Sequence, residues 1–284
     1  MEYSAIHFST ILLLKTHFKE RKITLKISIV TISFNQAEYL KKCIDSILSQ
    51  NFKDLEYIVV DPGSNDGSRE IIESYGDQLI KVFEKDSGAA DGLNKGFSRA
   101  TGDIFGFINS DDELLPGALE KVADAFRTNS RTGVISGCGY FVDASGAFLK
   151  SITPSQLTPW RYAHGAVTVF QQGTFFRSEW FRKVGGFNVE NRTCWDGELF
   201  LDMALAGAHF KTIGEELAIF RLHDASITGS GRLKELYARD ADRLFRSALK
   251  RPRSARDRYI AILARLRKWL FEPSWLIRRM ARLR

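Results

Sequence analysis

Short apolar runs alternate with segments of helical periodicity along the first half of the chain. Four runs have the length and the β-branched or aromatic content of strands: residues 26–33, 55–60, 79–84 and 104–108. Between them, apolar residues recur at helical spacing, at 38–50, from 68 onward and around 91–96. Four strand–helix alternations within about eighty residues predict an α/β fold with a doubly wound, mostly parallel sheet.

The fourth apolar run ends abruptly in Asn109, Ser110, Asp111 and Asp112. In open α/β sheets, ligands bind beyond the carboxyl ends of the strands, and these side chains would lie there. Adjacent carboxylates repel each other, so a cation between them and a phosphorylated ligand would suit them. The alternative is a polar loop that caps a helix beginning near Pro116.

Four motifs follow one another along this predicted sheet: residues 30–35 (VTISFN), 58–68 (IVVDPGSNDGS), 94–96 (NKG) and 108–112 (INSDD). Together they resemble the donor half of glycosyltransferase family 2, the inverting enzymes of GT-A fold. The likeness runs roughly from Lys26 to Asp224. We therefore divide the chain into an N-terminal extension (1–25), a GT-A domain (26–231) and a basic helical tail (232–284). The domain would have a Rossmann-like donor half (26–115) and an acceptor half (116–231).

Two positions depart from the family pattern. Pro62 stands where the family often has a second acidic residue, and Asn109 replaces the first Asp of the usual metal motif. Asn109 brings no charge, so we expect weaker metal affinity, whereas Asp111 matches the position that binds the metal directly. His223 lies in a segment that resembles the family's Arg-x-His motif, and imidazole suits Mn²⁺ better than Mg²⁺. The resemblance thus implies Mn²⁺ or Mg²⁺ held by Asp111 and His223, with a purely structural His223 as the alternative.

The resemblance also implies a set of residues that bind the donor nucleotide. Asp61 would accept a hydrogen bond from the base N–H of a uracil or guanine ring, although a turn-forming Asp would look the same in sequence. Asp91 and Lys95 would lie near the ribose and diphosphate, or would simply pair with each other at i and i+4. The remaining donor candidates are Ser33, Asn35, Asn109 and Ser110.

The second half should bind the acceptor. Residues 171–177 resemble the strand that returns across the donor site, which makes Gln172 a candidate acceptor contact. The family places its general base at the start of the helix after Trp195; Asp196 matches it best and Glu198 is the second candidate. Trp195 would stack on a sugar ring or belong to the core. Acids in a first helical turn also interact favourably with the helix dipole, which is the structural alternative for Asp196 and Glu198.

Composition indicates the size of the core and the cellular compartment of the protein. A chain of 284 residues with 44% hydrophobic content can bury one core or one and a half. Its three cysteines form no disulfide framework, which indicates a reducing cytoplasm. The apolar run at 11–14 is too short to span a bilayer or to form the core of a signal peptide.

Charge is concentrated at the C-terminal end. Residues 250–284 contain twelve Lys and Arg against two acids, a balance of +10, so the other 249 residues carry −3 of the total of +7. An apolar stripe with Trp269 and Trp275 runs through this basic segment. Basic amphipathic helices with interfacial tryptophans are typical of membrane surfaces. We therefore expect peripheral binding to the anionic inner face of the cell membrane. The alternative is that the stripe docks on the core; nucleic acid is not expected, because the aromatics are not interleaved for stacking.

The resulting interpretation is a metal-dependent, cytoplasmic, membrane-associated glycosyltransferase. It would transfer a sugar from a UDP- or GDP-type donor to a hydroxyl of a lipid-linked or cell-surface glycan. A nucleotidyltransferase on a similar fold is the rival enzyme class, but residues 33–36 lack the glycine- and Arg/Lys-rich loop that a triphosphate requires. A catalytically weak nucleotide-sugar-binding protein is the rival without transfer, supported only by Asn109 and Pro62.

Overall fold

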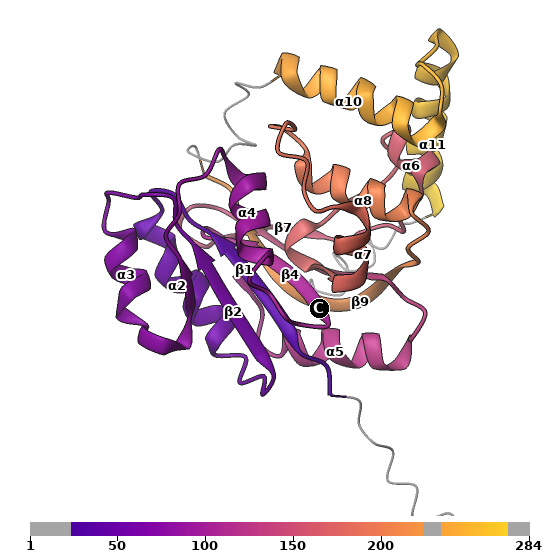
Figure 1. Cartoon of the computed structure of the whole chain (residues 1–284). Coiled ribbons are helices and arrows are strands. Elements are labelled where there is room, and N and C mark those ends of the chain that lie inside the picture. The colour runs from indigo at the N-terminus through magenta and orange to yellow at the C-terminus, as the bar shows by residue number, and fades with distance from the viewer. Residues whose placement is uncertain (1–23, 224–233, 272–284) are drawn as a thin grey trace, which may run out of the picture.

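The computed structural model describes residues 24–223 and 234–271, which form one nine-stranded mixed sheet with helices on both faces (Figure 1). The strand order is β3-β2-β1-β4-β8-β6-β9-β5, and β7 pairs with β6 outside this path. Predictions on residues 1–23, 224–233 and 272–284, including Trp275, lie outside the described residues.

The donor half has the predicted strand–helix alternation. Its strands β1 (Ile27–Ile32), β2 (Leu55–Val60), β3 (Ile80–Val82) and β4 (Ile104–Asn109) pair in parallel. They are connected by α2 (Ala37–Leu48), α3 (Ser68–Ser74) with the 3-10 turn η1 (Gly76–Gln78), and α4 (Ala89–Phe97). Gly96 explains part of the NKG motif, because a Cβ there would lie 2.4 Å from Val30 Cγ1. The missing side chain therefore lets α4 pack closely on β1.

The second half continues the sheet in mixed orientation. Its strands are β5 (Glu113–Leu114), β6 (Val134–Val142), β7 (Phe148–Ile152), β8 (Thr174–Arg177) and β9 (Phe210–Arg221). Its helices are α5 (Ala118–Thr128), α6 (Pro159–Ala163), α7 (Ser178–Val184) and α8 (Trp195–Leu205). Strand β8 is antiparallel to both β4 and β6, so it joins the two halves. The strand expected at 171–177 begins only at Thr174, because the preceding η2 (Gln171–Gly173) is a 3-10 turn.

Two apolar layers hold the sheet. On one face α2, α3 and α5 pack through residues such as Leu40, Ile72 and Val122. On the other face α4, α7 and α8 enclose a phenylalanine cluster whose rings lie 4.8–6.3 Å apart: Phe97, Phe105, Phe176, Phe181 and Phe187. This double cover is the reason why the central strands are apolar on both faces.

Two further helices follow the sheet. Helix α10 (Lys234–Leu249) packs Leu244, Phe245 and Ala248 against Leu201 of α8 and Ala163 of α6. Helix α11 (Ala255–Phe271) is anchored by the buried Asp257, whose carboxylate lies 3.4 Å from His164 Nε2. None of the helices within the described ranges is both long and apolar enough to cross a membrane.

Helix α11 turns most of its large apolar residues outward. Ala264 is buried, whereas five large side chains are each at least half exposed: Tyr259, Ile262, Leu263, Leu266 and Leu270. The alternative that this stripe docks on the core is therefore wrong for these five residues.

Candidate active site

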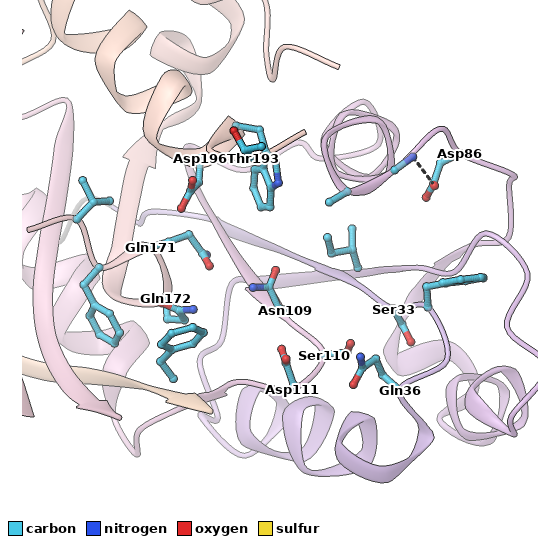
Figure 2. A pocket seen from close by; sticks show the side chains of 18 of the residues that line it. Ser33, Gln36, Asp86, Asn109, Ser110, Asp111, Gln171, Gln172, Thr193 and Asp196 are labelled. Atoms are coloured by element: carbon cyan, nitrogen blue, oxygen red, sulfur yellow. Dashed lines mark hydrogen bonds between the residues drawn. The ribbon is translucent and has the colours of Figure 1, made fainter. Parts of the chain in front are cut away.

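A cavity of about 880 Å³ opens at the carboxyl edge of β1 and β4 and extends beneath the start of α8 (Figure 2). Its wall combines polar side chains from both halves of the domain: Ser33, Asn109, Ser110 and Asp111 from the donor half, and Gln172 and Asp196 from the acceptor half. With Trp195, the cavity thus brings together seven of the residues that the sequence analysis selected.

Ser33 borders this cavity directly after β1. Its side chain is buried, and its hydroxyl has no hydrogen-bond partner among the residues that the structure describes. A buried hydroxyl without a partner costs about 1–3 kcal/mol, so Ser33 is suited to a polar ligand. Asn35 lies nearby but outside the cavity wall, and its Oδ1 accepts from Asn65 N at 3.0 Å. Asn35 therefore ties the β1–α2 loop to the β2–α3 loop.

Asp61 organises the β2–α3 loop. Its carboxylate is fully buried and accepts from Gly63 N (2.9 Å), Ser64 N (2.8 Å) and Ser64 Oγ (2.5 Å), with Arg69 Nε at 3.3 Å. Pro62, the next residue, lies at the cavity wall. The same carboxylate thus shapes the loop that faces the cavity.

Asp91 and Lys95 form the i,i+4 pair that the sequence left open as an alternative. Lys95 Nζ lies 3.1 Å from Asp91 Oδ2, which also accepts from Ser87 N at 2.8 Å. The cavity wall here is formed by Lys85 and Asp86. Burial raises the pKa of Asp86, a residue that the sequence analysis did not select.

The two adjacent carboxylates after β4 point to different surroundings. Asp111 borders the cavity, and its Oδ2 lies 2.9 Å from His223 Nε2. Asp112 is fully buried and accepts from Arg221 N at 2.9 Å and Gln172 Nε2 at 2.8 Å. Burial, and then the charge of Asp111, hold the pKa of Asp112 well above its usual range. The expectation of a cation between both carboxylates is therefore wrong, because Asp112 is engaged inside the protein.

Asp111 and His223 fit a divalent ion that is shared with a substrate. Within residues 24–223 and 234–271, no group of three His, Cys, Asp or Glu side chains could hold a metal ion without other ligands. Ions such as Mg²⁺ commonly take one or two protein ligands and complete their shell with substrate phosphates and water. The Asp111 carboxylate at the cavity wall and the His223 imidazole beside it meet this requirement.

The first turn of α8 also carries two acids in different surroundings. Asp196 borders the cavity and accepts from Gly197 N at 2.7 Å, and burial raises its pKa. Trp195 beside it borders the cavity as well, with its ring 5.7 Å from Phe107 and 5.4 Å from Phe187. Trp195 is therefore both a core residue and part of the wall.

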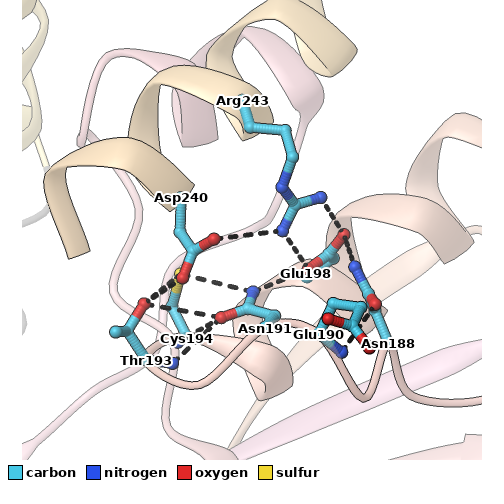
Figure 3. A network of polar contacts seen from close by, with 8 residues as sticks. All are labelled: Asn188, Glu190, Asn191, Thr193, Cys194, Glu198, Asp240 and Arg243. Atoms are coloured by element: carbon cyan, nitrogen blue, oxygen red, sulfur yellow. Dashed lines mark hydrogen bonds and ion pairs between the residues drawn. The ribbon is translucent and has the colours of Figure 1, made fainter. Parts of the chain in front are cut away.

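Glu198 faces away from the cavity wall, toward α10 (Figure 3). It is buried, and its carboxylate accepts hydrogen bonds from both terminal nitrogens of Arg243, with Nη2 at 2.7 Å from Oε2. It also accepts from Asn191 Nδ2 at 2.6 Å and from Asn188 Nδ2 at 3.1 Å. Burial acts to raise the pKa of Glu198, but these hydrogen bonds outweigh it and lower the pKa. Glu198 is thus held as an anion inside a polar network.

Sequence reasoning assigned no role to Asn94 or Arg243, and it assigned Asp112 to a shared cation rather than to the internal bonds that it makes. Asn94 lies in the NKG motif and bonds the backbone of Phe187 through both side-chain atoms, at 2.9 Å each. The motif was a usable signal for Asn94, and the INSDD motif was one for Asp112. Nothing in the local sequence around Arg243 indicates its partner 45 residues away.

Comparison with known proteins agrees with this geometry. Residues 28–185 match the family model described as Glycosyl transferase family 2. An uncharacterized glycosyltransferase of Nostoc sp. is 29% identical over 218 residues, 71% of this chain and 66% of that protein. One of Bacillus subtilis is 26% identical over 219 residues, 71% of this chain and 62% of that protein. The chain thus spans just under two thirds of these relatives.

Solved structures share the fold at low sequence identity. S. aureus TarS 1-349 in complex with UDP-GlcNAc superposes with a TM-score of 0.64 at 16% identity, covering 85% of this chain and 70% of that one. A mannosyltransferase from Pyrobaculum calidifontis, in complex with GDP-Man and Mn²⁺, gives 0.59 at 18% identity, covering 92% and 77%. The resemblance and the fold class inferred from sequence are confirmed: the chain belongs to glycosyl transferase family 2 and has the GT-A fold.

Proposed function

We propose that this chain is an inverting glycosyltransferase that moves a sugar from a nucleoside diphosphate sugar to an acceptor hydroxyl. One observation carries the proposal: Asp111, paired with His223, and Asp196 border the same cavity from the two halves of the domain. Such a transfer needs a site for a metal ion that offsets the charge of the departing diphosphate, and a carboxylate that accepts the proton of the acceptor hydroxyl.

The donor would occupy the part of the cavity beyond β1 and β4. Ser33, Asn109 and Ser110, which border the cavity, would contact it, while Asn35, Asp61, Asp91 and Lys95 would act through the loops that they hold. Structural neighbours were solved with UDP-GlcNAc and with GDP-Man, which supports a donor of this class.

Asp111 and His223 would hold Mn²⁺ or Mg²⁺ against the donor diphosphate. The ion, when bound, supplies positive charge that stabilises the departing diphosphate. Asn109 would add an uncharged oxygen ligand or a hydrogen bond, which leaves Asp111 as the only charged residue of its motif at the cavity wall.

Asp196 would act as general base on the acceptor. The acceptor oxygen attacks the anomeric carbon as the bond to the diphosphate breaks, the hydroxyl proton passes to the Asp196 carboxylate, and the diphosphate leaves with the bonding electrons. The raised pKa of Asp196 improves proton acceptance near neutral pH. Trp195 and Gln172, which border the same cavity, would position the acceptor sugar.

Helix α11 would place the enzyme on a membrane surface. Its outward row of Ile262, Leu263 and Leu266 is exposed beside the exposed Arg265 and Arg267. Apolar burial and attraction to anionic lipid would act together there. A lipid-linked glycan on the cytoplasmic face is the acceptor that this placement favours.

A ligand-stabilisation panel tests the proposal. We expect UDP, GDP or one of their sugars to raise the unfolding temperature with Mn²⁺ and much less with EDTA. At about a hundredfold excess over Kd the gain is ~2.7 kcal/mol. A stabilising donor that is neither transferred nor hydrolysed would instead support the nucleotide-sugar-binding protein.

A further inference from the structure

The segment from Phe187 to Glu198 carries the acceptor side of the cavity between two other parts of the molecule. Thr193, Trp195 and Asp196 of this segment border the cavity. The positions of these side chains therefore depend on what holds the segment at either side.

The donor half holds one side. Asn94 of α4 donates to Phe187 O and accepts from Phe187 N, both at 2.9 Å. Arg192 reaches Ser87 O in the loop before α4. These bonds join the start of the segment to α4, and its middle to the loop that carries Lys85 and Asp86.

Helix α10 holds the other side (Figure 3). Arg243 engages both oxygens of Glu198, and Asp240 Oδ2 accepts from Thr193 Oγ1 at 2.7 Å. Inside the segment, Asn191 donates to Glu198 and accepts from Thr193 N and Cys194 N, at 3.0 Å each. Asp240 and Arg243, one turn apart on α10, thus bind Thr193 and Glu198, the two ends of the stretch that contains Asp196.

We propose that Arg243 is a positioning residue for the acceptor side of the active site, which rests on the general-base role proposed for Asp196. A bidentate guanidinium–carboxylate pair fixes orientation as well as charge, and it fixes the first turn of α8 two residues beyond Asp196. The family match ends at residue 185, so this clamp is built from a part of the chain beyond it. Helix α10 is accordingly a working part of the transferase unit and not only a connection to α11.

Substitution of Arg243 in the full chain tests the clamp. We expect Arg243→Gln to lower kcat by about 10- to 100-fold, because small displacements of a catalytic group have effects of this size. The KM for the donor should stay within about twofold. Arg243→Lys should recover part of the loss, since it restores charge without the fork, and Asp240→Ala should cost less than Arg243→Gln. Arg246→Gln, an exposed arginine one turn along the same helix, is the matched control.

Hydrogen–deuterium exchange supplies a readout that does not depend on activity. Amides of residues 188–198 should exchange faster in Arg243→Gln than in Arg246→Gln, while those of β1 and β4 stay unchanged. Unchanged kcat, or unchanged exchange in this segment, would overturn the clamp. If the wild-type chain transfers no sugar while the exchange difference appears, the proposed function fails and the structural clamp stands.

Discussion

The edge of the sheet after β4 and the first turn of α8 each carry two neighbouring acids, and in each pair only one borders the cavity. Asp111 and Asp196 border it, whereas Asp112 and Glu198 are buried and bonded inside the protein. The two inward acids differ in what surrounds them. Neutral donors meet Asp112 and its pKa is raised, while Arg243 meets Glu198 and its pKa is lowered. Both acids are buried, so the charge of the partner decides whether the pKa of the inward acid moves up or down.

The largest effect is expected at Asp111, the acid of the sheet-edge pair that borders the cavity. Asp111→Ala should abolish transfer and Mn²⁺-dependent donor stabilisation, because it removes the charged half of the Asp111–His223 pair. Asn109→Ala should be milder, since Asn109 brings no charge. Thermal shift with UDP, with and without Mn²⁺, measures both variants. Full transfer in EDTA would contradict the metal site.

Asp196 is the acid of the α8 pair that borders the cavity. Asp196→Asn should keep donor binding and slow transfer by roughly 10²–10⁴-fold, the usual contribution of general-base catalysis. Single-turnover kinetics with a saturating donor measures this directly. Glu198→Gln is the matched control on the same turn, and we expect a smaller loss from it. An inactive Glu198→Gln beside an active Asp196→Asn would reverse the assignment.

The two inward acids should affect stability with opposite pH dependence. The pKa of Glu198 is lowered on folding, so its stabilisation is present above the unfolded pKa and is lost as pH falls. Glu198→Gln should therefore cost more at pH 7 than at pH 4, about 1.5–3 kcal/mol at pH 7, the usual contribution of a hydrogen bond to a charged group.

Asp112 has the reverse sign. Its pKa is raised on folding, so its contribution is favourable at low pH and is lost as pH rises above the unfolded pKa. Asp112→Asn should therefore be less destabilising at pH 7 than at pH 4. Urea unfolding at the two pH values measures both variants. If the destabilisation by Asp112→Asn and by Glu198→Gln changed with pH in the same direction, the contrast would be refuted.

The smallest effect concerns α11. Replacing Ile262 and Leu266 with Ser should weaken pelleting with anionic vesicles several-fold and leave UDP stabilisation unchanged, because both side chains are exposed. Each Lys or Arg near an anionic surface adds about 1 kcal/mol, so salt should release part of the bound wild type. Point substitutions are preferable to truncation before Ala255, which would remove Asp257 from the buried His164. Equal pelleting with neutral vesicles would remove the electrostatic part of the proposal.

The sequence by itself predicted the parallel donor half, with β2 at its observed bounds and β1 and β4 within about one residue of them. Periodicity and turn residues are local signals, and three of the four motifs lie at strand ends, so Asp111 could be selected from the sequence alone. Asp196 was selected by the family resemblance at the helix after Trp195. Tertiary structure alone decided the mixed order β8-β6-β9-β5 and which acid of each pair borders the cavity. Those outcomes depend on partners distant in sequence, such as Gln172 for Asp112 and Arg243 for Glu198. A carboxylate has the same local sequence whether it meets a ligand or a guanidinium, so only the folded chain distinguishes the two.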